Sequence, residues 1–185
     1  MTTWSGVPFY NRQYPMISAT ILYVLFILAF IVHDGEEIAM EHKWVLTHGD
    51  ALCARFPKLR RLFCHLRRMS TKAFTIAVLE ELAVLVAITV YALVGGPYGI
   101  ELWSVAFMVF SIHFVVHVGQ AIVVRGYVPG LVSSILLLPF SCYGMKGICH
   151  TFSASQLLLY GAIGVVIMVA NLAFAHWLGM KITKH

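Results

Sequence analysis

Long apolar runs constrain this chain more than any other feature of its sequence. A run of about twenty apolar residues is long enough to cross the hydrocarbon core of a bilayer as a helix. Such runs occur at residues 16–40, 73–94, 102–124, 131–143 and 156–180. Since 60% of the 185 residues are hydrophobic and 11% are charged, soluble domains are excluded. The sequence therefore predicts an all-α fold: a polytopic membrane helix bundle of about five transmembrane helices in one domain.

The fourth run, 131–143, is the shortest and contains Pro139. Because proline removes a helical hydrogen bond, we expect this segment to tilt, to stop partway or to be re-entrant. Residues 95–97 (Gly-Gly-Pro) and 127–130 (Tyr-Val-Pro-Gly) predict tight connections on either side of the third run. Residues 1–15 lack the pattern of a cleavable signal, so we expect the first helix to be retained.

The basic residues are distributed asymmetrically, and this predicts an orientation. Most of them fall in residues 43–72, which we interpret as a basic loop. Five spans would place this loop with Arg125, Lys181 and Lys184 on one side and leave Arg12 and Lys146 on the other. Lysine and arginine accumulate on the cytoplasmic side, so we expect an outside N-terminus and a cytoplasmic C-terminus, in the inner membrane for a bacterial protein. Topology also explains the net charge of +5 without nucleic-acid binding.

Ionisable side chains lie in or beside four of the apolar runs. Each costs roughly 2.5 kcal/mol or more at the bilayer centre, so such residues indicate a functional site. The residues that we assign to this site as metal ligands are His33, Glu36, Glu37, Glu80, Glu81, His113, His117 and His176.

Spacing and depth favour one shared site over scattered polar residues. His33, Glu36 and Glu37 are spaced i, i+3, i+4, which places them on one helix face. His113 and His117 are spaced i, i+4, as in helices that contribute two imidazoles to one metal. Counted at about 1.5 Å per residue from the predicted cytoplasmic ends, His33, Glu81, His113 and His117 lie at depths of roughly 12 to 18 Å, and His176 lies at about 8 Å. There are simpler interpretations. The first group, His33, Glu36 and Glu37, would cap its helix at the membrane surface. The second, His113 and His117, would be hydrogen-bonded packing residues.

Four further acidic residues lie near the site, and their roles differ. Glu80 and Glu81 point about 100° apart on a helix, so at most one faces the centre of the site, and the sequence does not rank them. We interpret Asp34 and Glu41 as part of an interfacial cap outside the site.

The cysteines do not form a metal-binding pattern. Cys53 and Cys64 lie in the basic loop and should be reduced, whereas a disulfide between Cys142 and Cys149, near the outer end of the fourth run, is left open.

The sequence resembles a known family at these motifs. Residues 33–37, His-Asp-Gly-Glu-Glu, are similar to the motif of the HXXEE integral membrane proteins. The later histidine and YXPG motif of that family resemble His113 or His117 and residues 127–130. The resemblance implies a membrane-embedded enzymatic site and supplies no substrate.

The residue types restrict the metal and the chemistry. Histidines and carboxylates without thiolates suit iron, manganese or zinc. Their number favours two ions, which we expect to be irons, with zinc or manganese as the alternatives, as in carboxylate-rich helix bundles. Our first hypothesis is therefore a di-iron oxidoreductase that acts on a lipid-like, hydrophobic small molecule from the bilayer, with an electron donor as a further partner.

Two other hypotheses remain open. The first is a zinc-dependent hydrolase of a lipid amide or ester, in which a spare glutamate serves as the base. In both enzymes Glu37 and Glu81 are the candidate catalytic residues. The second is a proton- or cation-coupled transporter. The sequence leaves the substrate, the metal and the oligomeric state undetermined.

Overall fold

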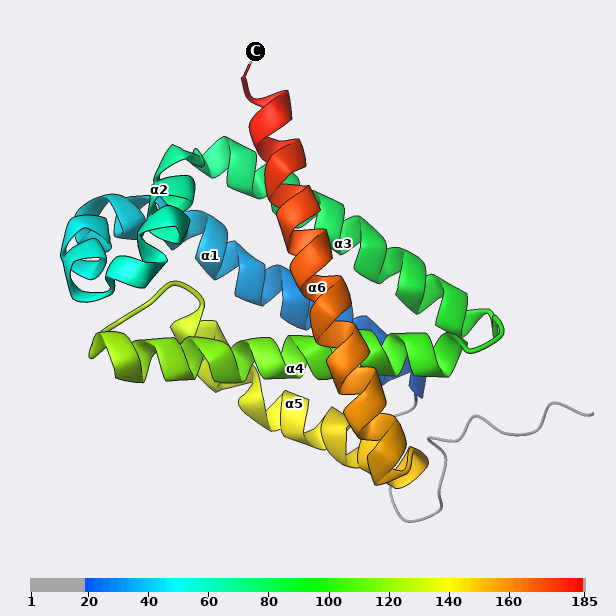
Figure 1. Ribbon diagram of the computed structural model, residues 1–185. Coiled ribbons are helices and arrows are strands. Elements are labelled where there is room, and N and C mark those ends of the chain that lie inside the picture. Colours follow the sequence, from blue (N-terminus) through cyan, green and yellow to red (C-terminus); the bar gives the residue numbers. More distant parts are fainter. Residues whose placement is uncertain (1–18, 185) are drawn as a thin grey trace, which may run out of the picture.

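The computed structural model describes residues 19–184, which form six α-helices and one short 3-10 helix (Figure 1). These are α1 (Ala19–Arg55), η1 (Pro57–Leu59), α2 (Arg60–Arg68), α3 (Thr71–Leu93), α4 (Gly99–Val124), α5 (Leu131–Thr151) and α6 (Ala154–Ile182). Four of these helices, α3 to α6, are long and apolar enough to cross a membrane. The prediction of an all-α, polytopic membrane helix bundle is confirmed.

The first predicted span is part of a longer helix. Of residues 16–40, those from Ala19 onward form the first half of α1, residues 16–18 lie outside the described part of the chain, and Arg12 lies outside it as well. α1 is not among the four spanning candidates, so the fifth span stays a prediction. The helix passes through the polar residues after Val32 because no proline interrupts it before Pro57.

The basic segment 43–72, predicted to connect two spans, is mostly helical. It comprises the end of α1, then η1 and α2. Phe63 is buried and anchors α2, and the Arg67 guanidinium donates to both carboxylate oxygens of Asp50 at 2.6 and 2.9 Å. The guanidinium lowers the pKa of Asp50 below its usual value. This exposed pair connects α2 to α1.

The fourth predicted span is part of a longer, continuous helix, α5. α5 runs from Leu131 to Thr151 with Pro139 inside it. Proline removes one helical hydrogen bond, which the remaining turns of the helix tolerate. The prediction ended at Tyr143 because Lys146 and His150 lower the local hydropathy, although nothing in that stretch stops a helix.

The geometry of α5 also decides whether Cys142 and Cys149 can form a disulfide. Cys142 and Cys149 are seven positions apart on this helix, so they are about 10 Å apart along its axis. Disulfides need Cα atoms closer than about 7 Å. Both cysteines are free, and they cannot be bridged to each other without breaking α5.

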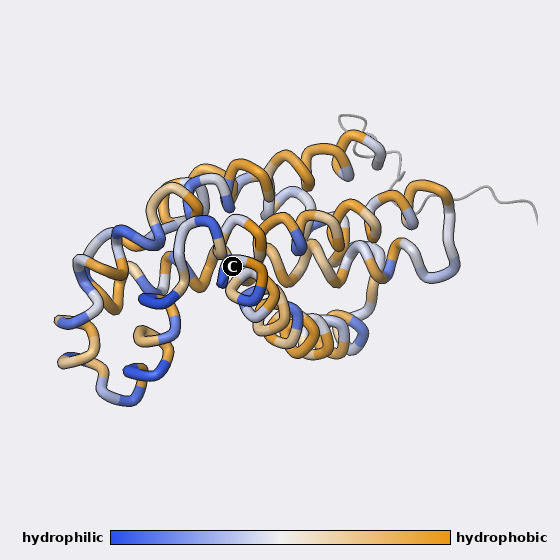
Figure 2. The backbone as a smooth tube through the Cα atoms, turned by 90° about the horizontal axis from the view of Figure 1, so that it is seen from above, coloured by the Kyte–Doolittle hydropathy of each residue, from blue (hydrophilic) through white to orange (hydrophobic). Residues whose placement is uncertain are grey.

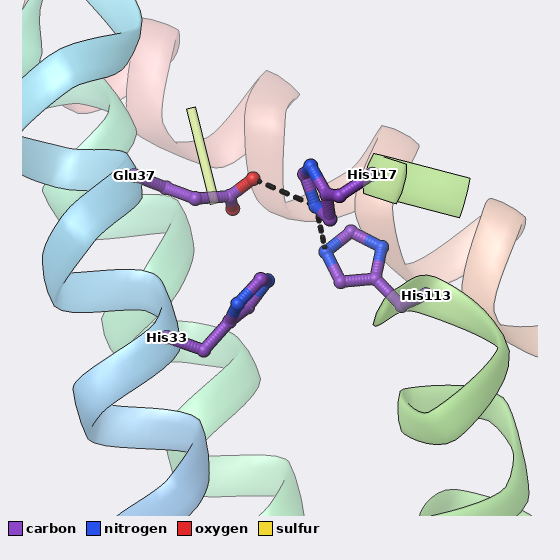
Figure 3. Close-up of side chains that lie close together, drawn as sticks. All are labelled: His33, Glu37, His113 and His117. Carbon is purple, nitrogen blue, oxygen red and sulfur yellow. Dashed lines mark hydrogen bonds and ion pairs between the residues drawn. The ribbon is translucent and has the colours of Figure 1, made fainter. Parts of the chain in front are cut away.

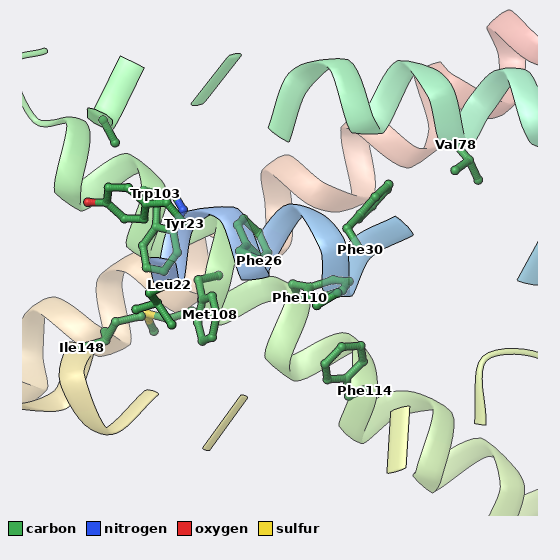
Figure 4. Close-up of a cluster of buried hydrophobic side chains, with 13 residues drawn as sticks. Leu22, Tyr23, Phe26, Phe30, Val78, Trp103, Met108, Phe110, Phe114 and Ile148 are labelled. Carbon is green, nitrogen blue, oxygen red and sulfur yellow. The ribbon is translucent and has the colours of Figure 1, made fainter. Parts of the chain in front are cut away.

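Aromatic packing between α1 and α4 forms the core (Figure 4). The ring of Trp103 lies 4.6 Å from that of Tyr23 and 5.5 Å from that of Phe26, measured between centroids. Phe26 also packs on Phe107 and Phe110 at 5.4 Å. These contacts set α1 against α4, and the polar residues of both helices follow one or two turns later.

Glycines let the helices approach closely. A Cβ on Gly179 of α6 would overlap the backbone of Ala73 in α3, and one on Gly144 of α5 would overlap the ring of Phe107. Small residues at such crossings are typical of membrane helix packing. In Figure 1, α6 crosses the other helices and ends near the beginning of α3.

The basic residues gather at one end of the bundle. Arg55 at the end of α1 donates to the carbonyl of Val124 at the end of α4 at 3.1 Å. His65 of α2 lies 3.3 Å from His176 near the end of α6. Figure 2 shows hydrophilic residues concentrated in the segment that contains α2. The side of the membrane that this end faces stays a prediction.

The close approach of α6 to α3 generates a first prediction. Gly179→Leu should lower the free energy of unfolding by about 1 to 3 kcal/mol or more, because the added side chain must displace the backbone of α3. Thermal unfolding in detergent measures the effect. Gly161→Leu is the matched control, since a Cβ there meets only the flexible end of Met108 at 3.6 Å. Equal midpoints for the two variants would contradict the assignment.

Candidate metal centre

Four of the predicted ligands come together in the structure (Figure 3). His33 and Glu37 project from α1, and His113 and His117 project from α4. One ligand atom from each lies within 4.8 Å of the other three. The i, i+4 spacing on each helix puts both side chains on the facing surfaces, and the aromatic core holds the two helices at this distance.

The tautomer of His33 leaves one ring nitrogen available as a ligand. The Ser133 hydroxyl donates to the carbonyl of Gly130 at 3.3 Å, so its oxygen accepts the proton on Nδ1 of His33 at 2.9 Å. Nε2 of His33 then carries the lone pair, and it is buried without a hydrogen-bond partner among residues 19–184. Such an outer hydrogen bond is the usual support of a metal-binding histidine.

The other three groups meet at one point. Nε2 of His117 lies 2.8 Å from Nε2 of His113 and 3.1 Å from Oε1 of Glu37. Nδ1 of His117 has no hydrogen-bond partner in the described chain. Since imidazole nitrogens and a carboxylate oxygen can share one cation, the residues present fit a zinc or iron ion.

Gly130 forms the floor of this cluster. It has a φ of +79°, a backbone conformation that favours glycine. A Cβ there would lie 2.9 Å from Cε1 of both His33 and His117 and 3.1 Å from Oε1 of Glu37. The fourth residue of the Tyr-Val-Pro-Gly turn therefore gives the cluster room that a side chain would occupy.

Glu36 is not brought to the cluster. Its carboxylate accepts hydrogen bonds from the Tyr127 hydroxyl at 2.7 Å, the Ser133 amide at 2.7 Å and the Val132 amide at 3.3 Å. It thereby caps the exposed amides at the start of α5. Burial and the hydrogen bond to Glu36 raise the pKa of Tyr127 above its usual value. Glu36 connects α1 to the turn that carries Gly130 and Ser133.

The remaining predicted ligands lie at different places around the cluster. Glu80 accepts a hydrogen bond from the Asn171 amide at 3.2 Å, which joins α3 to α6. Glu81 lines a cavity beside the cluster, which resolves the choice between the two glutamates in favour of Glu81. His176 lines the same cavity, but its nearest polar partner is His65.

This cavity has a volume of about 460 Å³ and is continuous with the cluster. Its wall includes Glu37, His113 and His117, together with Asp34 and Glu41, for which the sequence predicts an interfacial cap. The side chain of Asp34 is only 5% exposed, and its Oδ2 has no partner within the described residues. The spacing of Asp34 and Glu41 indicates that they share a helix face with Glu37, because residues 34, 37 and 41 are related as i, i+3 and i+7.

Comparison with known proteins identifies one family. A family model described as a protein of unknown function with HXXEE motif matches residues 24–144. The match begins in α1, ends in α5 and contains all four residues of the cluster. No curated protein and no solved structure matches the chain.

The cap made by Glu36 generates the second prediction. Tyr127→Phe removes a hydrogen bond to a carboxylate and should lower the free energy of unfolding by about 1.5 to 3 kcal/mol. Chemical unfolding in detergent measures the loss. Tyr98→Phe is the control, since Tyr98 is 80% exposed. If both variants unfold like the wild type, Glu36 does not hold the turn.

Proposed function

The chain belongs to the family of proteins with the HXXEE motif, and we propose that it is a membrane-embedded, metal-dependent enzyme. The observation that carries this proposal is the convergence of three imidazoles and one carboxylate within 4.8 Å inside an apolar bundle. Ionisable groups at such a place are costly and mark function. The cavity beside the cluster gives a reactant access to it.

We propose one zinc ion as the metal. Four ligand atoms that converge on a single point suit one ion, and histidines with a carboxylate suit zinc. We assign the three imidazoles as the ligands, because three histidines with the fourth position left open are typical of catalytic zinc. A zinc ion held by these residues would supply hydroxide near neutral pH, which would favour hydrolysis of an ester or amide in a lipid-like molecule.

The two candidate catalytic carboxylates receive separate roles. Glu37, with Oε1 3.1 Å from Nε2 of His117, holds that imidazole and lies beside the three histidine ligands. Glu81 comes from α3 and lines the cavity, where a reactant would lie next to the cluster. We assign Glu81 as the group that takes up a proton during the reaction.

A di-iron oxidoreductase is the second candidate, and one observation favours it. Asp34, Glu41 and Glu81 line the same cavity as Glu37, and Oδ2 of Asp34 is buried without a partner in the described chain. A second ion beside Glu37 would use these carboxylates, as in bundles that hold two irons. Such an enzyme would oxidise a lipid-like molecule and need an electron donor.

We place the basic end of the bundle on the cytoplasmic side. The ends of α1, α4 and α6, the beginning of α3 and all of α2 lie there, and they carry most of the lysine and arginine of the chain. The positive-inside rule then puts the C-terminus in the cytoplasm and, with a fifth span, the N-terminus outside.

Metal analysis gives the third prediction. Protein purified in detergent without added metal should hold about one zinc ion per chain, as measured by mass spectrometry. His113→Ala should weaken zinc binding by more than the roughly 10- to 100-fold that follows loss of an outer partner. His176→Ala is the control, because His176 lies beside His65 and should leave the zinc content unchanged.

Other outcomes of the metal analysis would contradict the zinc enzyme. Metal-free wild-type protein, or zinc retained in His113→Ala, would reject the metal centre and leave the buried acids as a proton or cation path. About two irons per chain, with one lost in Asp34→Asn, would replace the zinc hydrolase by the second candidate.

A further inference from the structure

The cavity beside the cluster has two chemically different ends. At one end its wall is formed by Glu37, Glu81, His113 and His117. At the other end the wall is apolar and comes from η1, α2 and the beginning of α3, with Leu62, Leu66, Phe63 and Phe74 among its residues. Most of the lining is apolar, and its carboxylates come from α1 and α3, while His176 lines the cavity beside His65 of α2.

α2 separates this space from the basic surface of the protein. Leu59, Leu62, Phe63 and Leu66 lie on one side of the helical period and line the cavity. Arg60, Arg61 and Arg68 lie on the opposite side, around an open hollow. The amphipathic α2 is therefore the cover of the apolar end, and its basic face points away from the cavity.

The size and lining of the cavity restrict what can occupy it. Its volume of about 460 Å³ lies within the range of small-molecule pockets, which is roughly 300 to 1,000 Å³. A wholly polar molecule would leave the apolar wall without favourable contacts, and a plain hydrocarbon would leave the carboxylates and imidazoles unpaired. An amphiphile with one polar group and one hydrocarbon tail satisfies both ends.

Resting on the proposed function, we infer that the substrate is a single-tailed amphiphile, such as a fatty acyl ester or amide. Its polar group lies at the cluster of His33, Glu37, His113 and His117, and its tail lies beneath α2. The apolar surfaces of α3 to α6 connect the protein to a bilayer, which is the source of such molecules.

Gly119 offers a way to test the tail without disturbing the cluster. It lies in the cavity wall on α4, and a Cβ there would meet no atom within 4 Å. A leucine at this position has space to grow and raises helix propensity, so it should not destabilise the fold. It should reduce the room for a hydrocarbon tail.

The experiment measures how affinity depends on tail length. The full chain is placed in nanodiscs of fixed phosphatidylcholine composition, and cis-parinaric acid, a fluorescent fatty acid, is displaced by saturated fatty acids of increasing length. Energy transfer from tryptophan reports binding, because Trp44 lines the cavity. Wild-type affinity should rise about fourfold per methylene and then level off when the tail fills the cavity.

In Gly119→Leu the affinity should level off at a shorter tail. Excluding two methylenes would weaken binding of the longest fatty acid about fifteenfold. Gly161→Leu is the matched control, since it makes the same change in α6 outside the cavity wall and should behave like the wild type. Both variants should hold as much zinc as the wild type.

The outcomes separate this inference from the proposed function. A wild type whose affinity never levels off shows partition into lipid alone and overturns the inference, as does an equal effect of Gly119→Leu and Gly161→Leu. These results would leave the zinc measurement unchanged. In a third outcome, the affinity levels off at a shorter tail in Gly119→Leu, but the protein holds no metal. This result would support the position of the tail and reject the metal-dependent function.

Discussion

The carboxylate of Glu36 joins two parts of the chain that are far apart in sequence, and the geometry of the candidate centre depends on this connection. It accepts the Tyr127 hydroxyl and two amides at the start of α5. The first amides of a helix have no partner within the helix, and a carboxylate at the helix N-terminus is a favourable acceptor for them. By capping α5, Glu36 fixes the turn at residues 127–130, and with it the positions of Gly130 and Ser133.

The two glutamates of the motif have divided tasks for a geometric reason. Adjacent side chains on a helix diverge by about 100°, so Glu36 and Glu37 cannot serve the same centre. Glu36 faces the turn before α5, whereas Glu37 faces His117 on α4. His33, one turn earlier, completes the arrangement by bonding to Ser133. A five-residue motif thus supplies one structural carboxylate and two groups of the candidate centre.

Sequence periodicity predicted the fold class and the four converging side chains, because helical spacing and depth are local properties. It could not assign Glu36 to a cap, since the partners of this carboxylate come from a turn about 90 residues later, and local patterns do not report such contacts. The choice between Glu80 and Glu81 likewise depended on where α6 places Asn171. Asp34 and Glu41 were missed because we read polarity near Val32 as the membrane surface. The lengths of α1 and α5 were underestimated because hydropathy reports lipid exposure rather than the end of a helix.

The attachment of α2 has a consequence for the energetics of the molecule. Its polar tethers are the exposed pair Arg67 and Asp50 and the contact between His65 and His176, and Phe63 is its only buried side chain. Solvent-exposed ion pairs contribute little to stability, whereas the aromatic packing of α1 on α4 is dense and enclosed. We therefore expect two levels of cooperativity, with α2 detaching at a small fraction of the free energy needed to unfold the bundle. Amide hydrogens in α2 exchange through these local openings, while those of the core exchange only when the bundle itself comes apart.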